Sequence, residues 1–128
     1  MATTMPSSSL DLCHLLQERR AHELELLTDL TDEQLQGVLM REVERPIWEM
    51  GHVGWFQEYW ILRHLGGANS VMKGSDSFYD SSTMYTHERA GFSLPSRSET
   101  LEYIATVLDR SVERLRSREP SAEEIYYY

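Results

Sequence analysis

Residues 45–60 read RPIWEMGHVGWFQEYW, and their large apolar side chains recur at the spacing of a helix. Positions three, four and seven apart share one helical face, so His52 is expected to lie among aromatic rings. These rings are Trp48, Trp55, Phe56 and Tyr59. Pro46 suits the first helical position, where its missing N–H costs nothing. The segment predicts a buried aromatic helix that runs to about Leu65.

Two glycines interrupt this helix, and two more follow it. Gly51 and Gly54 lower the helix propensity, which favours close approach by another part of the chain. Gly66 and Gly67 provide the left-handed stop that is common after a helix. We therefore predict a helix over about residues 46–65 that is packed tightly along one side.

Other helices are predicted from capping pairs, in which Ser or Thr precedes an acidic or amide residue by three positions. The pairs are Ser8 with Asp11, Thr31 with Gln34, Ser96 with Glu99, and Ser121 with Glu124. They predict a helix over about residues 9–29, a brief helix or turn up to about residue 40, a long helix that Pro120 ends, and the start of a fourth. The apolar stripes are Leu10, Cys13, Leu16, Leu24 and Leu27 in the first, and Leu101, Ile104, Leu108, Val112 and Leu115 in the long one.

These elements predict an all-α protein, an up-and-down four-helix bundle whose fourth helix is truncated after about two turns. Residues 1–8 are interpreted as a disordered tail and residues 9–128 as one helical domain that is incomplete at its C-terminal end. Residues 66–95 lack periodicity and are interpreted as an ordered crossing loop of functional length.

The composition argues against several classes of binding partner. The net charge of −9 argues against nonspecific binding to nucleic acid or to anionic membranes. No apolar run approaches the roughly 20 residues of a membrane span. The single Cys13 has no partner for an internal disulfide, so we expect a buried structural thiol and a cytoplasmic location.

Taken from the residues alone, His52 is either a satisfied core histidine or one ligand of a metal ion. His14 and His22, with Glu18 and Glu25, are interpreted as a solvated helix face, and His64 as a histidine that suits a helix C-terminus. No His-x-x-x-His pair is present in the sequence. Phosphate-binding loops, nucleophile elbows and Cys pairs are also absent from it.

The run RPIWEMGHVGWFQEYWIL at residues 45–62 resembles the Pro-x-x-Trp-x-x-Gly-His-x-x-Trp-Phe signature of a known family. This is the DinB-like helical domain of ergothioneine synthase-type, non-heme iron sulfoxide synthases. The resemblance continues through FYDSSTMYTHERAGFSLPSRSETLEYI at residues 78–104, where it is closest to the selenoneine-synthase-like branch. It covers most of residues 10–125.

The resemblance implies a DinB-like bundle in which His52 binds iron(II), with two further ligands from a His-x-x-x-His pair on the fourth helix. That pair is missing here, so we expect an incomplete iron site and an inactive chain when these 128 residues stand alone. The implied substrates are a small-molecule thiol or selenium donor and a histidine-derived betaine. The implied reaction forms a C–S or C–Se bond, with O2 as oxidant. A C-terminal formylglycine-generating-enzyme-like domain would complete the site.

Tyr85, His87 and Arg89 are the candidate substrate contacts because they lie in the long loop. Arg89 would grip a carboxylate in bidentate fashion, and its alternative is an ordinary surface ion pair. The alternative for the whole chain is a non-catalytic DinB-like binding or assembly domain, or a degenerate fragment.

Overall fold

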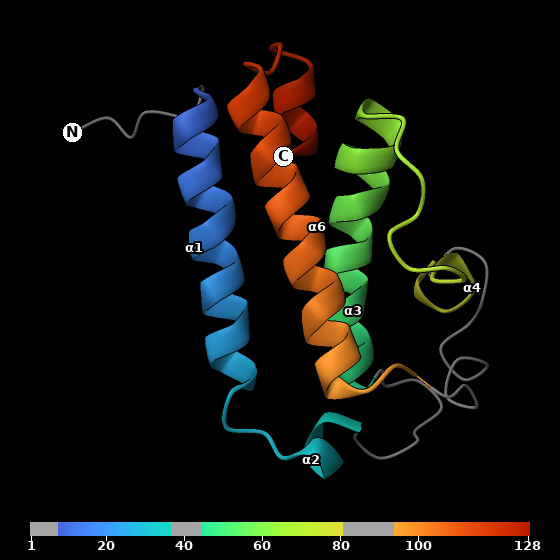
Figure 1. Ribbon diagram of the computed structural model, residues 1–128. Helices are drawn as coiled ribbons and strands as arrows, with labels where there is room; N and C mark the ends of the chain where they lie inside the picture. The colour runs from blue at the N-terminus through green and yellow to red at the C-terminus, as the bar shows by residue number, and fades with distance from the viewer. Residues whose placement is uncertain (1–7, 37–44, 81–93) are drawn as a thin grey trace.

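The computed structural model describes residues 8–36, 45–80 and 94–128, and every regular element within these ranges is a helix. The all-α prediction is confirmed. Figure 1 shows the elements in chain order. They are α1 (Ser9–Leu27), α2 (Asp32–Gln36), α3 (Pro46–Gln57), the π-helix η1 (Glu58–Leu65), α4 (Asp76–Tyr79), α6 (Arg97–Ser117) and the 3-10 helix η2 (Glu124–Tyr127).

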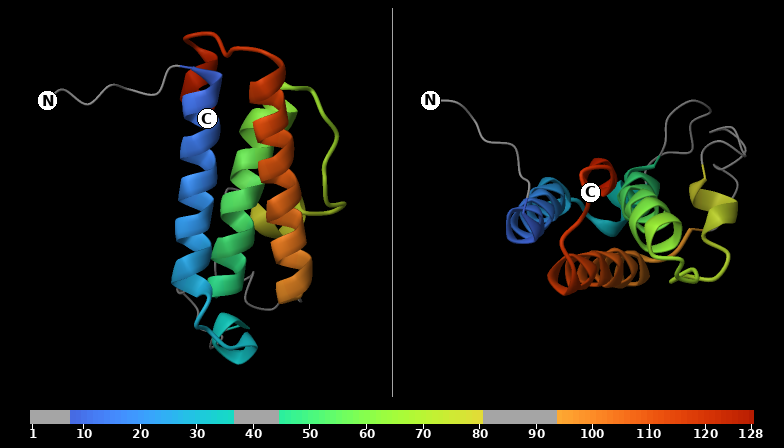
Figure 2. Two further views of the ribbon diagram at one scale, coloured as in Figure 1. Left: turned by 60° about the vertical axis from the view of Figure 1, so that its left-hand side comes forward. Right: turned by 90° about the horizontal axis from the view of Figure 1, so that it is seen from above.

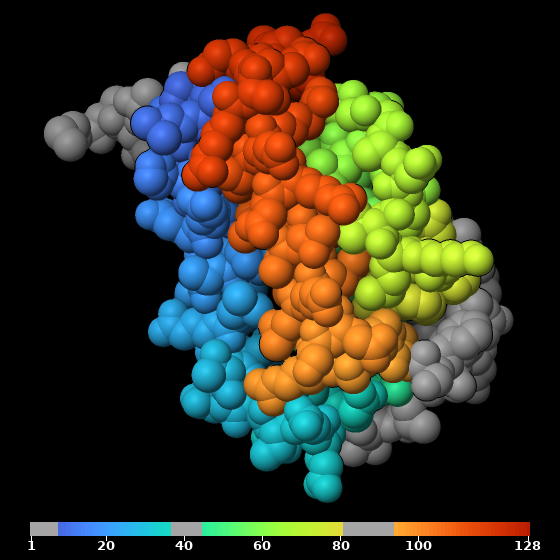
Figure 3. Space-filling view, in the orientation of Figure 1, coloured from blue at the N-terminus to red at the C-terminus, as the bar shows by residue number. Residues whose placement is uncertain are grey.

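α6 forms the spine of the molecule, because it packs against α1 on one side and against α3 with η1 on the other. Figure 3 shows α6 running between α1 and the segment that contains η1. The view from above in Figure 2 places the C-terminal segment between α1 and α3, across from α6. α1, α6 and the α3–η1 rod therefore form three sides of an arrangement, and η2 is the element that the described residues place on the fourth side.

The capping predictions describe the helix starts well. Ser8 Oγ accepts from the Asp11 N–H at 3.1 Å, so Ser8 is the N-cap of α1. The Ser96–Glu99 pair forms a complete capping box at the start of α6. Thr31 and Gln34 exchange two bonds across the start of α2. Each cap satisfies backbone N–H groups that a helix start leaves without a partner.

The aromatic helix over residues 46–65 is confirmed, but it changes type within its length. After Gln57 the hydrogen bonds follow π-helical spacing, and the Gly66 N–H donates to the Ile61 carbonyl at 3.1 Å. Gly67 adopts φ +67° and ends the rod, as the glycine pair predicts. No sequence pattern indicated the π-helix. Such helices are rare overall, and those that occur often lie near functional sites.

Two other segments differ from the sequence predictions. Residues 66–95 contain the short helix α4, although no periodicity predicted one there. Ser121 and Glu124 exchange their two capping bonds at 3.2 Å, yet the chain continues as a single 3-10 turn and not as an α-helix. A turn this short gains little from helical propagation, so tertiary contacts decide its geometry.

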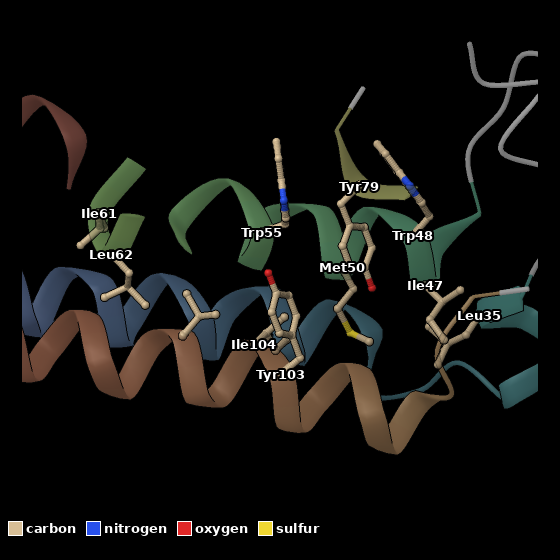
Figure 4. Close-up of a cluster of buried hydrophobic side chains, with 11 residues drawn as sticks. Leu35, Ile47, Trp48, Met50, Trp55, Ile61, Leu62, Tyr79, Tyr103 and Ile104 are labelled. Atoms are coloured by element: carbon tan, nitrogen blue, oxygen red, sulfur yellow. The ribbon is translucent and has the colours of Figure 1, made fainter. Parts of the chain in front are cut away.

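The core lies between α3, η1 and α6, as Figure 4 shows. Ile104 and Val107 on α6 are fully buried there, and Ile104 packs where Gly54 leaves room for it. Two stripe predictions were wrong, because Leu10 is exposed at the start of α1 and Leu101 lies at the exposed rim of α6. The buried face of α6 therefore differs from the predicted stripe, because it leaves out Leu101 and includes small polar residues and Tyr103. Its buried residues are Thr100, Tyr103, Ile104, Val107, Ser111, Val112 and Leu115.

A second apolar cluster joins α1 to the C-terminal half of α6. It contains the buried thiol of Cys13, whose Sγ lies 3.8 Å from the Val112 carbonyl, as expected of a structural cysteine. Across residues 8–36, 45–80 and 94–128, we find no helix with the length and apolarity needed to cross a membrane.

Candidate functional site

His52 lies on α3 in a row of aromatic rings. Its ring stacks on Trp48 with centroids 4.5 Å apart and planes 11° apart, and Trp55 follows at 5.8 Å. Phe56 lies at 6.3 Å in a tilted arrangement. Trp48, Trp55 and Phe56 are thus confirmed as neighbours of His52, whereas Tyr59 pairs with Trp55 and Trp60. The prediction of a buried aromatic face was wrong at Phe56 and Tyr59, which are exposed. The His52 ring is partly buried, so it is neither sealed into the core nor free in solvent.

One ring nitrogen of His52 has a defined partner. Nδ1 lies 2.8 Å from the backbone carbonyl oxygen of Tyr79. Because a carbonyl only accepts hydrogen bonds, Nδ1 must carry the proton. In the neutral ring Nε2 then holds the lone pair. Histidines that bind metals usually have this arrangement, with the second N–H donated to a carbonyl or carboxylate that fixes the tautomer.

The carbonyl that receives Nδ1–H belongs to α4, and two tryptophans of α3 hold the same short helix. Trp48 Nε1 donates to the Phe78 carbonyl. Trp55 Nε1 donates to Asp76 Oδ1 at 2.7 Å. Local spacing in the sequence does not predict these partners, because they lie more than 20 residues further along the chain. The only available signal was the 48, 52, 55 spacing, which puts three ring N–H donors on one helical face.

Gly51 allows α4 to pack this closely. A side chain at position 51 would overlap the phenol ring of Tyr79, which is itself buried. The Tyr79 ring stacks on Tyr103 of α6, with centroids 6.0 Å apart. Burial raises the pKa of the Tyr79 hydroxyl to about 12, partly offset by a hydrogen bond with Thr100. The phenol therefore stays neutral and serves packing.

A buried acidic side chain, Glu58, bonds to Tyr103, the residue on which the Tyr79 ring stacks. Glu58, the first residue of η1, is fully buried, and its Oε1 accepts from the Tyr103 hydroxyl at 2.6 Å. Its Oε2 accepts from the Val71 N–H, which ties the segment after η1 to the core. Burial, followed by the bond to Glu58, raises the pKa of Tyr103 above its usual range. Glu58 thus has both oxygens satisfied and acts as an internal anchor.

The other predicted site residues fall into two groups. Tyr85, His87 and Arg89 fall within residues 81–93, outside the described part of the chain. His14 and His22 are exposed on α1, in agreement with a solvated face, and His64 is exposed beside the rings of Trp60 and Tyr127. Within the described ranges, no three His, Cys, Asp or Glu side chains gather closely enough to hold a metal ion.

An apolar groove runs between α1 and α3, on the side opposite the main packing face of α6. One part of it, a hollow of about 370 Å³, is lined by Leu24, Leu26, Leu27, Pro46, Met50, Val53 and Ile104, with Glu23 and Glu49. At the C-terminal end of the molecule the groove continues to Phe56 and Ile61, and Tyr126, Tyr127 and Tyr128 lie over it.

Arg20 crosses the floor of the groove and links three helices. Its side chain is buried, with one guanidinium nitrogen 2.7 Å from Gln57 Oε1 on α3 and another donating to the Ile104 carbonyl on α6. Burial lowers the pKa of Arg20, and Glu23, 3.6 Å away, opposes this effect. The guanidinium therefore serves as a structural crosslink beneath an apolar surface.

The family model of the DinB superfamily matches residues 15–127, which is nearly the whole chain. The matched range includes the aromatic rod, α4, α6 and η2. No curated protein matches the sequence.

Proposed function

Because the chain belongs to the DinB superfamily, we propose that it is the iron-ligand-bearing helical domain of an Fe(II)- and O2-dependent enzyme. The proposed enzyme forms a C–S or C–Se bond to a histidine-derived betaine, as in ergothioneine or selenoneine biosynthesis. The observation that supports this most is the 2.8 Å contact between His52 Nδ1 and the Tyr79 carbonyl. That contact leaves Nε2 with a lone pair for a metal, as ligating histidines require.

In this proposal, His52 donates one nitrogen ligand and the remaining ligands come from outside the described residues. Trp48 and Trp55 flank the imidazole and limit the approach of water. The Tyr79 carbonyl keeps the proton on Nδ1. When iron(II) is bound, the chemistry that it supplies is activation of O2 for coupling the sulfur or selenium donor to the betaine ring.

The groove between α1 and α3 is the proposed seat of a fourth helix. Its lining is almost entirely apolar, and Leu26 and Val53 are exposed on its two walls. A helix laid there would cover these side chains and complete a four-helix bundle. A His-x-x-x-His pair on that helix would place two more imidazoles on one face.

The substrate contacts remain a proposal for residues outside the described ranges. Arg89 would hold a carboxylate of the thiol or selenium donor, and Tyr85 and His87 would line the same loop. We also propose that the enzyme is cytoplasmic and that a C-terminal formylglycine-generating-enzyme-like domain completes the active site. The natural reading frame of the protein tests this proposal most directly, by the presence or absence of a His-x-x-x-His pair and a large second domain.

The decisive experiment uses the protein as its natural reading frame encodes it. Iron content and C–S or C–Se product formation are compared among the wild type, His52→Asn and His64→Asn. His64 is the matched control because it is an exposed histidine on the same rod. We expect H52N to lose iron and product by at least roughly tenfold, the effect usual even for an outer-shell partner of a metal ligand, while H64N keeps both.

Two results would overturn the proposal. One is a wild-type protein without iron or product, which would favour the non-catalytic binding domain. The other is an H52N variant that keeps its iron. The 128 residues alone are expected to bind Fe(II) weakly, since a single imidazole holds the ion poorly against water. Stoichiometric nanomolar binding by this chain would contradict the assignment of missing ligands.

A further inference from the structure

Asp76, the first residue of α4, accepts hydrogen bonds from two side chains of the aromatic rod, Trp55 and Arg63. Its Oδ1 accepts from Trp55 Nε1 at 2.7 Å and from Arg63 at 2.7 Å, while its Oδ2 accepts from the other terminal nitrogen of Arg63 at 2.9 Å. The guanidinium also lies over the Tyr59 ring, 5.3 Å from its centroid. A bidentate pair braced in this way fixes direction as well as distance.

Two contacts hold α4 on the rod: Trp48 donates to the Phe78 carbonyl near its end, and Asp76 anchors its beginning. α4 is a single turn, so its last carbonyl groups follow from the placement of its first residue. Three residues after Asp76, the Tyr79 carbonyl meets His52 Nδ1 at 2.8 Å. The buried Tyr79 ring resists sliding along the rod, but a ring alone does not set the rotation of its own carbonyl.

We infer that Asp76 is a positioning residue for His52: through α4 it places the Tyr79 carbonyl where only the Nδ1–H tautomer of the imidazole fits. Asp76 itself is not in contact with the imidazole. The use of the free Nε2 for a metal rests on the proposed function. The control of the tautomer by Asp76 does not, so the two can fail separately.

The test reads the tautomer directly in the 128-residue chain without metal. Long-range 1H–15N correlation spectra of histidine-labelled protein, recorded where the ring is neutral, separate Nδ1–H from Nε2–H. Wild type should show His52 as Nδ1–H. Asp76→Ala should lower the ratio of Nδ1–H to Nε2–H by about tenfold, the size expected when a hydrogen bond to one form is lost.

The control is Asp32→Ala, which removes another exposed Asp–Arg pair, the one with Arg97 at 3.3 Å, which joins the start of α2 to the start of α6 and does not involve α4. We expect it to leave the His52 tautomer unchanged. Half of the Asp76 side chain is exposed, so its removal should leave the core folded. Arg63→Gln is the gentler second variant, because the Trp55 bond to Asp76 can persist while the bidentate pair is lost.

An unchanged His52 tautomer in folded D76A overturns the inference. If D76A does not fold, the R63Q spectrum decides: a shift toward Nε2–H supports the inference, and a wild-type signature overturns it. A shifted tautomer in D76A together with an H52N enzyme that keeps its iron would leave Asp76 as a positioning residue and refute the proposed iron ligand.

Discussion

At position 51 a missing side chain shapes the site, because the space above Gly51 is filled by the phenol ring of Tyr79. That ring is buried and stacked on Tyr103, so it has little freedom to move aside. The same close packing brings the Tyr79 carbonyl to His52. Glycine here costs helix propensity and in return admits α4.

Gly51→Ala should therefore destabilise the protein, although alanine normally favours a helix interior by about 1 kcal/mol over glycine. Forcing a methyl group into a filled site typically costs about 1–3 kcal/mol, so we expect a net loss of up to roughly 2 kcal/mol. Urea unfolding measures it, with Glu49→Ala on the exposed face of α3 as control. A G51A protein more stable than wild type would contradict the packing described.

Tyr79 also predicts a response to alkaline pH. Burial raises the pKa of its hydroxyl to about 12 in the folded protein, whereas the unfolded value is near 10. The folded state holds this proton more tightly, so its stabilising effect is complete below about pH 10 and is lost as the pH rises toward 12.

Wild type should consequently lose stability between pH 10 and 12 more steeply than Tyr79→Phe, by up to about 1.4 kcal/mol per pH unit. Denaturant unfolding at several pH values gives both slopes. Tyr126→Phe is the control, because Tyr126 is 90% exposed and its substitution should leave the slope as in wild type. Equal slopes for wild type and Y79F would mean that the Tyr79 hydroxyl ionises as freely as in water.

Among the elements, those with local signals were predictable. α1, α2 and α6 begin at capping pairs, and the rod follows from aromatic spacing and the Gly66–Gly67 stop. α4 and the π-helix carry no such signal, because both depend on partners distant in sequence: Trp55 for Asp76, and Val71 and Tyr103 for Glu58. For the same reason, His52 was found from the sequence and its carbonyl partner was not.

Glu58 gives the π-helix its clearest link to the segment that precedes α4. Replacing it by leucine would leave the Tyr103 hydroxyl and the Val71 N–H without their acceptor. Each unsatisfied donor costs roughly 1–3 kcal/mol, so Glu58→Leu should be strongly destabilised. Glu58→Gln is the matched control, since its amide can accept from Val71 and donate to Tyr103.

Urea unfolding and hydrogen exchange of the Val71 amide distinguish the two Glu58 variants. E58L should exchange this amide faster and unfold at lower urea, whereas E58Q should stay close to wild type. If leucine proved neutral, the two hydrogen bonds would contribute nothing net, as happens when apolar packing replaces a buried polar network.

At the scale of the whole molecule, α1 and the α3–η1 rod both pack on α6. The described residues therefore leave an apolar groove open between α1 and α3. Among the described residues, Tyr126, Tyr127 and Tyr128 line one end of this groove. Arg20 of α1 links the two walls through Gln57 of α3 and also bonds to the Ile104 carbonyl of α6. A preformed apolar groove of this kind favours association with a helix or with another copy of the chain.

Leu26 and Leu10 make a matched pair for testing this, because both are leucines of α1 and they are 69% and 67% exposed. Leu26 lines the groove, and Leu10 does not.

We expect the 128-residue chain to self-associate reversibly and Leu26→Glu to weaken that association about tenfold, or about 1.4 kcal/mol. Leu10→Glu adds the same charge outside the groove and should change the association little. Sedimentation velocity over a range of concentrations measures both. If wild type stayed monomeric throughout, or if both variants weakened association equally, the groove would not be the surface through which the chains meet.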